Sequence, residues 1–366
     1  MTRTFAWVLP AALFACGTSR EPDGPTRSVT PAGIPPTAAK SASPTASASA
    51  SALPNPTQSA SGARLAMTSR APCPDTELDF KPTKSFEHSR SSLIASAEPH
   101  HFAVDSVAKQ GGTAVLRAKF SYGPTSKDLE DEKIVFFLED AGCKASEVGR
   151  STTDDDGWAR LEVPAGKVIL GEQRFTAVVE ADGSRSTASL HVVAPGTKAV
   201  VFDVDATLTT SDREVVEEVL KGHVPDMRPD GPAVVKAYAN KGFFIGYITG
   251  RPYLLLRNTK GWLVDKGFPR GFVRVTDHTR EAVPSETGVQ AYKLRALEEL
   301  KAAGLILTHA YGNATTDICA YAKAGFPPDK TWILGPHAGK ACDGFGKTVA
   351  LESYAKQLPL LPGLLP

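Results

Sequence analysis

Two carboxylates lie one residue apart at the end of an apolar run in the second half of the chain. The segment reads VVFDVDATLTTSD, so Asp203 and Asp205 follow the run directly and hydroxyl residues come next. In an extended strand the side chains alternate between two faces, which places both carboxylates on the same side. A helix cap or a loop acid accounts for one aspartate after a strand but not for two on one side. The D-x-D-x-T group, completed by Thr207, is therefore a candidate catalytic group.

Further polar residues follow the other apolar runs of this region. They are Thr249, Gly250 and Arg251 after one run, Asn313 after a later run, and Lys293 and Asp317 near the starts of two helices. Each could have an ordinary structural role when taken alone, since a hydroxyl often ends a strand and a lysine often lies on a solvated helix surface. Their order and spacing are what indicate a shared site, because parallel strands bring their carboxyl ends to one edge of a sheet.

The elements that would position these residues alternate between strand and helix. The first strand, KAVVFDVD, is continuously apolar before its acids, as a parallel strand covered on both faces requires. The predicted strands are 198–205, 243–250, 271–277, 305–312 and 330–335, and the predicted helices are 231–242, 252–266, 289–304 and 315–325. This alternation predicts an α/β domain with a doubly wound, Rossmann-like parallel sheet that binds ligands beyond the carboxyl ends of its strands.

The region before it has only strand patterns. Short runs rich in β-branched and aromatic residues, such as EKIVFFLED and QRFTAVVEADG, are separated by turns rich in Asp and Gly. This texture predicts an antiparallel, all-β sandwich of the immunoglobulin-like type. No acid–base group stands out in it, so we expect an accessory role for this domain.

The cysteines fit an exported protein. Besides Cys16 they are Cys73 and Cys143 in the predicted sandwich and Cys319 and Cys342 in the last domain. In an oxidising compartment a Cys73–Cys143 bond is a candidate, but four cysteines permit three pairings.

The N-terminus has the features of an export signal. Arg3 precedes an apolar stretch, residues 5–15, that is too short to span a bilayer. The stretch ends in LFAC, which resembles the bacterial lipobox, in which the cysteine is diacylated; here that residue is Cys16. The alternatives are an ordinary secretory signal and an uncleaved anchor. Lipidation would place the chain in the bacterial cell envelope as a membrane-anchored lipoprotein.

Composition completes the domain plan. Residues 17–72 are dominated by Ser, Ala, Pro, Thr and Gly, which predicts a disordered tether. The expected parts are a signal peptide 1–16, the tether 17–72, the sandwich 73–195 and the α/β domain 196–366. A formal net charge of +1 gives no overall attraction to nucleic acid, so we expect no nucleic-acid partner. The sequence names no protein partner.

The candidate residues resemble the four motifs of the haloacid dehalogenase (HAD) phosphohydrolase superfamily. The resemblance is closer to the LNS2 domain of lipins and of the membrane-associated phosphatidylinositol transfer proteins. The segments that carry it are DVDATLTTSD, YITGRP, GWLVDKGFPRG, AYKLRALEEL and HAYGNATTDICAYAKAGFP. They cover roughly residues 197–345, with Ala206 where the lipin block has glycine. No transfer domain and no N-terminal lipin domain is recognisable.

This resemblance implies a phosphatase that works through an aspartyl-phosphate. Asp203 would be the nucleophile, and Asp205 would protonate the leaving alcohol and then activate water. Mg²⁺ would be held by the carboxylates of Asp203 and Asp317 and by the main-chain carbonyl of Asp205. Thr249 and backbone N–H groups would bind the phosphoryl group, and Lys293 would neutralise charge and orient Asp203. Thr207, Gly250 and Asn313 would bind substrate. Asn313 would also support the metal site or the Asp317 loop.

The substrate is expected to be phosphatidate or a related membrane phospholipid. About twenty-five residues separate Thr207 from the next predicted helix, too few for a large cap domain over the site. The alternatives are a HAD phosphatase of small soluble phosphomonoesters and a non-catalytic, phosphatidate-binding LNS2 module. The transfer-protein versions of LNS2 tend to lose the motif acids, whereas this chain keeps them, which favours an enzyme. Arg251 would either contact substrate or form a structural salt bridge.

Overall fold

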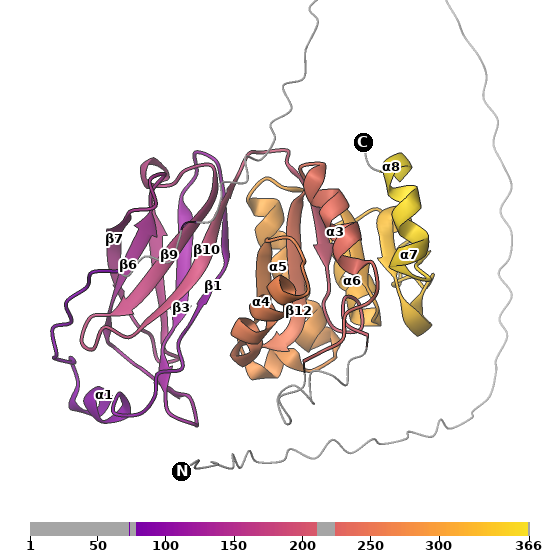
Figure 1. Cartoon of the computed structure of the whole chain (residues 1–366). Coiled ribbons are helices and arrows are strands. Elements are labelled where there is room, and N and C mark those ends of the chain that lie inside the picture. Colours follow the sequence, from indigo (N-terminus) through magenta and orange to yellow (C-terminus); the bar gives the residue numbers. More distant parts are fainter. Residues whose placement is uncertain (1–72, 74–77, 211–223, 365–366) are drawn as a thin grey trace, which may run out of the picture. The chain divides into compact units, whose positions relative to one another are not determined.

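The computed structural model describes residue 73 and residues 78–210 and 224–364 (Figure 1). The predicted signal peptide with Cys16, the predicted tether 17–72 and the last two residues of the DVDATLTTSD block lie outside this part. Of the helices within these ranges, none has the length and apolar character needed to cross a bilayer.

The first domain is built from strands. They are β1 Phe102–Val104, β2 Ser106–Lys109, β3 Ala114–Lys119, β4 Ser121–Tyr122, β5 Lys127–Asp128, β6 Lys133–Glu139, β7 Ala145–Thr152, β8 Trp158–Val163, β9 Gly171–Val179 and β10 Arg185–Val193, with one short helix, α1 Ser89–Ile94. They form a three-stranded sheet β1-β3-β8, a five-stranded sheet β2-β10-β9-β6-β7 and the small pair β4-β5. Alternate residues of the two larger sheets, such as Leu116, Phe136 and Phe175, share one buried core. The predicted β-sandwich is confirmed.

Two details of the sandwich differ from the prediction. Strand β2 pairs in parallel with β10, so the domain is not purely antiparallel. Strands β1, β2, β5 and β7 were not predicted; β7, the longest of them, has a largely polar sequence, ASEVGRST, and none of its side chains is buried. Strand β7 forms at the edge of its sheet, where its backbone pairs with β6. The pattern of its side chains does not predict this pairing.

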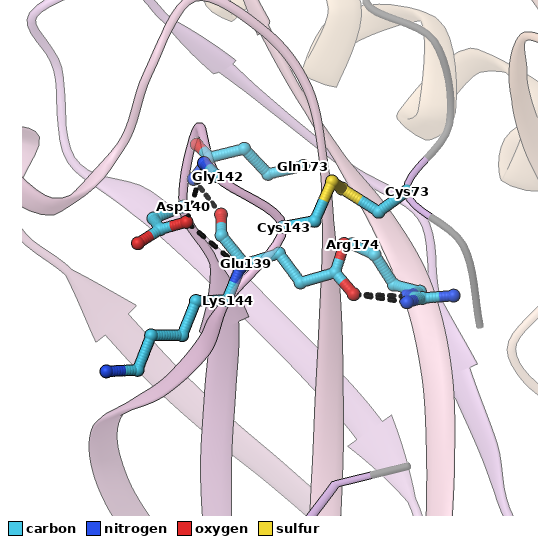
Figure 2. Close-up of a disulfide and its surroundings, with 8 residues drawn as sticks. All are labelled: Cys73, Glu139, Asp140, Gly142, Cys143, Lys144, Gln173 and Arg174. Carbon is cyan, nitrogen blue, oxygen red and sulfur yellow. Dashed lines mark hydrogen bonds and ion pairs between the residues drawn. A yellow bond between two sulfur atoms is a disulfide. The ribbon is translucent and has the colours of Figure 1, made fainter. Parts of the chain in front are cut away.

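The structure contains two disulfides, and both lie within a domain. Cys73–Cys143 ties the start of the sandwich to the turn between β6 and β7, and Cys319–Cys342 ties a helix of the second domain to its C-terminal segment. Figure 2 shows the first bond beside a turn in which Asp140 accepts hydrogen bonds from the backbone N–H groups of Gly142 and Lys144. Of the three pairings that the sequence permits, this is the one that contains the Cys73–Cys143 candidate.

The second domain is an α/β domain with six parallel strands. Its strands are β11 Lys198–Phe202, β12 Phe244–Pro252, β13 Phe272–Thr276, β14 Ile306–Gly312, β15 Thr331–Ile333 and β16 Val349–Ala350, and its helices are α3 Gly231–Asn240, α4 Leu256–Asp265, α5 Ala291–Ala302, α6 Thr315–Ala324, α7 Tyr354–Gln357 and α8 Leu361–Leu364. The strand order is β13-β12-β11-β14-β15-β16. The order reverses between β11 and β14, which is where an open α/β sheet binds its ligands.

Both faces of this sheet are covered, as the apolar strands require. In β11, Val200 and Phe202 join a core with residues of α3 and α4, while Ala199 and Val201 join a core with residues of α5 and α6. Helices α3 and α4 therefore pack on one face and α5 and α6 on the other (Figure 1). The predicted doubly wound fold is confirmed.

Asp105, between β1 and β2, links the sandwich to the α/β domain. Its buried carboxylate accepts hydrogen bonds from the backbone N–H of Val273 at 2.9 Å and of Ser189 at 2.9 Å, and from Lys260 Nζ at 2.6 Å. A carboxylate out of water needs such partners to offset its desolvation. These contacts fasten β13 and α4 to the sandwich, which gives that domain a structural part in holding the sheet.

Candidate active site

Asp203 lies at the carboxyl end of β11, beside the end of β14. Its backbone N–H donates to the carbonyl of Tyr311 at 2.9 Å, so the ladder between the two strands continues to this residue. The chain then turns tightly, because the N–H groups of Leu208 and Thr209 both donate to the carbonyl of Val204. The turn returns the Thr207 hydroxyl to Asp203 Oδ2, at 3.0 Å.

Lys293 joins the nucleophile candidate to a second acid. It lies in the first turn of α5, and its Nζ donates to Asp203 Oδ1 and to Asp317 Oδ1, each at 2.5 Å. Asp317 lies in the first turn of α6, where its Oδ2 accepts from the backbone N–H groups of Asn313 and Ala314 at 3.0 Å each. All three charged side chains are buried. The three residues that the sequence places far apart are thus in direct contact.

Burial perturbs the ionisation of this group. It raises the pKa of the Asp203 carboxyl to about 8; the Lys293 ammonium opposes the rise, and the carboxylates of Asp317 and Asp205 add to it. Burial alone would lower the pKa of Lys293, but the two carboxylates that it contacts outweigh burial and raise the pKa above its ordinary value. Lys293 therefore stays charged, and the acids around it still outnumber the positive charges that contact them.

Asp205 is held from another direction. Its Oδ2 accepts from the Thr249 hydroxyl at 2.8 Å, and its Oδ1 accepts from Arg251 Nε at 2.9 Å, with Arg251 Nη2 also at 2.9 Å. Thr249, Gly250 and Arg251 lie in the last part of β12. A Cβ on Gly250 would come within 3.0 Å of Val289, so the close packing here favours glycine. Of the two predicted roles for Arg251, the structure contains the salt bridge.

Asn313 points its amide between the two aspartates. One of the two terminal atoms of this amide lies 3.0 Å from the carbonyl oxygen of Asp205 and 3.2 Å from both Asp203 Oδ2 and Thr207 Oγ1. With nitrogen in that position, the amide donates to these oxygens. The Asn313 amide therefore links the two aspartates and Thr207 through hydrogen bonds.

The residues present suit Mg²⁺. The donors are all oxygens, namely the carboxylates of Asp203 and Asp317 and the carbonyl of Asp205, with Asn313 beside them, and Mg²⁺ is a hard cation that prefers oxygen. Burial is the main cause of the raised pKa of Asp203, and the carboxylates of Asp317 and Asp205 add to it. Over the described ranges no group of three or more His, Cys, Asp or Glu side chains forms a metal site. The predicted site is different in kind, since it needs only two carboxylates and a carbonyl.

Two residues that donate hydrogen bonds to the turn after Asp203 were not predicted from the sequence. Tyr354, in α7, donates its hydroxyl to the carbonyl of Thr207 at 3.1 Å, and Arg228 donates its Nε to the carbonyl of Ala206 at 3.0 Å. Neither lies at the end of a strand that the sequence predicts, so the rule that locates ligand-binding residues at strand ends does not identify them.

Ala206 stores strain in the turn. Its φ is 50°, in the left-handed region that favours glycine, and its backbone N–H donates to Thr209 Oγ1 at 2.9 Å. We expect Ala206→Gly to raise the free energy of unfolding by about 0.5 to 1 kcal/mol, since relief of strain exceeds the added entropy of the unfolded chain. Urea denaturation of the two proteins measures this. Ala206→Val is the matched control and should lower stability; a lower stability for the glycine variant would contradict the prediction.

Two family models match the chain. Residues 200–335 match the LNS2 domain of PITM 1-3, and residues 99–192 match the β-sandwich domain of PITM 1-3. The first range contains every residue of the site from Asp203 to Asp317, and the second contains β1 to β9 and most of β10.

Curated relatives match 66% to 76% of the chain. Membrane-associated phosphatidylinositol transfer protein 1 of Homo sapiens is 28% identical over 259 residues, 69% of this chain and 20% of that protein. Membrane-associated phosphatidylinositol transfer protein 3 of Mus musculus is 29% identical over 246 residues, 66% of this chain and 24% of that protein. Protein retinal degeneration B of Drosophila melanogaster is 28% identical over 286 residues, 76% of this chain and 21% of that protein. The chain thus spans about a fifth to a quarter of the length of these relatives.

Solved structures are more distant. The cobalt-bound form of deoxy-D-mannose-octulosonate 8-phosphate phosphatase from Haemophilus influenzae is 14% identical, with a TM-score of 0.30, and the match covers 45% of this chain and 88% of that one. A tetra-tandem repeat from a large adhesion protein is 15% identical, with a TM-score of 0.19, and the match covers 26% of each chain. At these scores the fold rests on the strand order described above.

The two matched regions occur in the order in which the structure places a β-sandwich and a parallel α/β sheet. The motif residues of the second region meet at the carboxyl ends of β11, β12 and β14. Residues 200–335 are therefore similar to the LNS2 domain of PITM 1-3, and residues 99–192 to the β-sandwich domain of the same proteins, the membrane-associated phosphatidylinositol transfer proteins.

Proposed function

We propose that this LNS2 domain is a Mg²⁺-dependent phosphomonoester hydrolase that works through an aspartyl-phosphate on Asp203. The observation that carries the proposal is the buried contact of Lys293 with Asp203 and Asp317, at 2.5 Å each. Burying three charges costs free energy that a purely structural core avoids by using apolar side chains. Clusters of this kind are typical of catalytic sites.

In the first half of the reaction, an oxygen of Asp203 attacks the phosphorus of the ester. A bond between that oxygen and phosphorus forms while the bond from phosphorus to the alcohol oxygen breaks, and the Asp205 carboxyl gives a proton to the departing alcohol. Lys293 keeps Asp203 oriented through its hydrogen bond. The Thr249 hydroxyl can turn from Asp205 to a phosphoryl oxygen, as the resemblance implies.

In the second half, water attacks the phosphorus of the aspartyl-phosphate. Asp205 now accepts the proton of that water, inorganic phosphate leaves, and the carboxylate of Asp203 is restored. Bound Mg²⁺, held by Asp203, Asp317 and the carbonyl of Asp205, would screen the charge of the phosphoryl oxygens.

We further propose that the substrate is phosphatidate or a related membrane phospholipid, acted on at the bacterial cell envelope. Two observations support this substrate. The relatives are named as membrane-associated lipid transfer proteins, and LFAC at Cys16 resembles a lipidation site. A small soluble phosphomonoester is the competing substrate, and phosphatidate binding without turnover is the competing function.

The test is release of inorganic phosphate from a set of substrates with and without Mg²⁺. The set holds phosphatidate in mixed micelles, glycerol 3-phosphate and 4-nitrophenyl phosphate, and each is assayed again with EDTA. We expect Mg²⁺-dependent release, with phosphatidate the best substrate by kcat/KM. Binding to phosphatidate liposomes with no release from any substrate would establish the sensor function instead.

Replacement of Cys16 by serine tests the membrane part of the proposal. About fifty flexible residues have a root-mean-square span near 40 Å, so an anchored chain could return its site to the bilayer. Anchoring also raises the local concentration of enzyme at the lipid surface, by about 100-fold or more where the tether permits it. We expect Cys16→Ser to lose at least about 10-fold in activity on phosphatidate vesicles and none on 4-nitrophenyl phosphate. Equal loss on both substrates, or on neither, would contradict a membrane-lipid role.

A further inference from the structure

Arg251 is buried directly behind Asp205. Its side chain is 0% exposed, whereas the side chain of Asp205 is 18% exposed. The aspartate therefore reaches the solvent side of the site and the arginine does not, so Arg251 has no access to a substrate. Any effect of this guanidinium on the reaction must pass through Asp205.

The contacts fix the carboxylate of Asp205 in one plane. Arg251 Nε and Nη2 both lie 2.9 Å from Oδ1, and the Thr249 hydroxyl lies 2.8 Å from Oδ2. A planar guanidinium that approaches with two nitrogens sets direction as well as charge. Oδ1 contacts a buried cation, whereas Oδ2 accepts from a hydroxyl that can turn to a phosphoryl oxygen, so Oδ2 is the oxygen that can exchange a proton with substrate or water.

Arg251 is itself held in place by two neighbouring elements, one through its guanidinium and one through its backbone carbonyl. Arg251 Nη1 donates to Thr259 Oγ1 in α4 at 3.2 Å, and the carbonyl of Arg251 accepts from Thr276 Oγ1 at the end of β13 at 3.3 Å. Both threonines are buried. A buried arginine is costly unless its partners are well placed, and here three elements supply them.

We propose that Arg251 is a positioning residue that aims Asp205 Oδ2 at the ester oxygen that leaves phosphorus. This role rests on the proposed phosphatase function. Asp203 and Asp205 then have different cationic partners, because Lys293 contacts Asp203 and Arg251 contacts Asp205.

The experiment uses two leaving groups. An alkyl phosphate such as glycerol 3-phosphate needs a proton from Asp205 when its alcohol departs, whereas 4-nitrophenolate departs readily without one. In Arg251→Met we expect kcat/KM to fall by about 100-fold or more for the alkyl ester and by less than about 10-fold for the nitrophenyl ester. Arg251→Lys, which keeps the charge without the two-nitrogen geometry, should recover part of the difference.

Arg274→Met is the matched control. Arg274 is another buried arginine of the same sheet, and it donates to Glu299 and to the carbonyl of Asp105 rather than to a residue of the site. We expect Arg274→Met to lower the melting temperature and to change kcat/KM by the same small factor for both esters. If Arg251→Met does not fold, Thr259→Val, which removes only the contact with Arg251 Nη1, should show the same ester preference in weaker form.

The outcomes separate the two proposals. Equal losses on both esters, or no loss in the Arg251 variants, would overturn the positioning role alone. A wild-type chain that hydrolyses neither ester nor phosphatidate would overturn the phosphatase function, and the role of Arg251 with it.

Discussion

Asp203→Asn is expected to lower phosphate release by at least about 10⁴-fold, because it removes the proposed nucleophile. The fold should survive the change. The asparagine oxygen can still accept from Lys293 Nζ, which donates to Asp203 Oδ1 in the native chain. Lys293 also keeps its contact with Asp317, so the ammonium is not left without a carboxylate partner. Phosphate release and the melting temperature, measured side by side, check both halves of the prediction.

Asp205→Asn is the companion variant, since it removes the acid–base group and keeps Asp203. It should be nearly as slow on an alkyl phosphate but should accumulate phosphorylated protein with 4-nitrophenyl phosphate, because water is no longer activated in the second step. Mass spectrometry of the quenched reaction detects that species. An Asp203→Asn protein with wild-type turnover would remove Asp203 from the mechanism.

The sheet of the α/β domain was predictable because its strands are buried on both faces. In β11, every residue from Ala199 to Phe202 is buried, and a continuous apolar run of this length is typical of a parallel strand between two layers of helices. The carboxyl-end rule then located Asp203 and Thr249 without any knowledge of contacts. The order of the strands in space, with β14 beside β11, was not predicted, because the apolar pattern of a strand does not identify its neighbours.

The sandwich was less predictable at its edges. The parallel pairing of β2 with β10 joins residues 106–109 to residues 190–193, and no local pattern records a contact between segments so far apart. The polar strand β7 forms because β6 beside it offers backbone groups, which a count of apolar side chains cannot detect. Both features depend on tertiary context, which overrides local preference in sheets.

Within the site, the sequence predicted which residues lie together but not which of them contact Asp203 and which contact Asp205. It named Asp203, Asp205, Thr249 and Lys293, and the structure brings them together. It did not predict that the Thr249 hydroxyl and the Arg251 guanidinium would both donate hydrogen bonds to Asp205. That pairing depends on the path of β12 past its last predicted residue, and side-chain direction there is set by packing against α4 and β13.

Lys293→Met is expected to remove both activity and stability. Methionine keeps much of the length of lysine but leaves Asp203 and Asp317 buried without the ammonium that contacts both. Removing one partner of a buried ionic group costs about 3 to 5 kcal/mol. For a chain of this size that loss lowers the melting temperature by roughly 10 °C. Phosphate release should fall by at least about 100-fold, since Asp203 loses its orientation and the phosphoryl charge loses a neutralising group.

The double variant Lys293→Met/Asp317→Asn separates the two effects of that change. It removes one negative charge together with the positive one, so only one buried carboxylate, Asp203, is left without the ammonium instead of two, and part of the lost melting temperature should return. Activity should not return, because neither the orientation of Asp203 nor the second carboxylate of the proposed cation site is restored. Asp317→Asn alone keeps the ion pair of Lys293 with Asp203, so it should be more stable than either variant that lacks the ammonium. If Lys293→Met melts like the wild type, the ammonium is not the charge that holds Asp203 and Asp317 together, and the central contact of the proposed site is wrong.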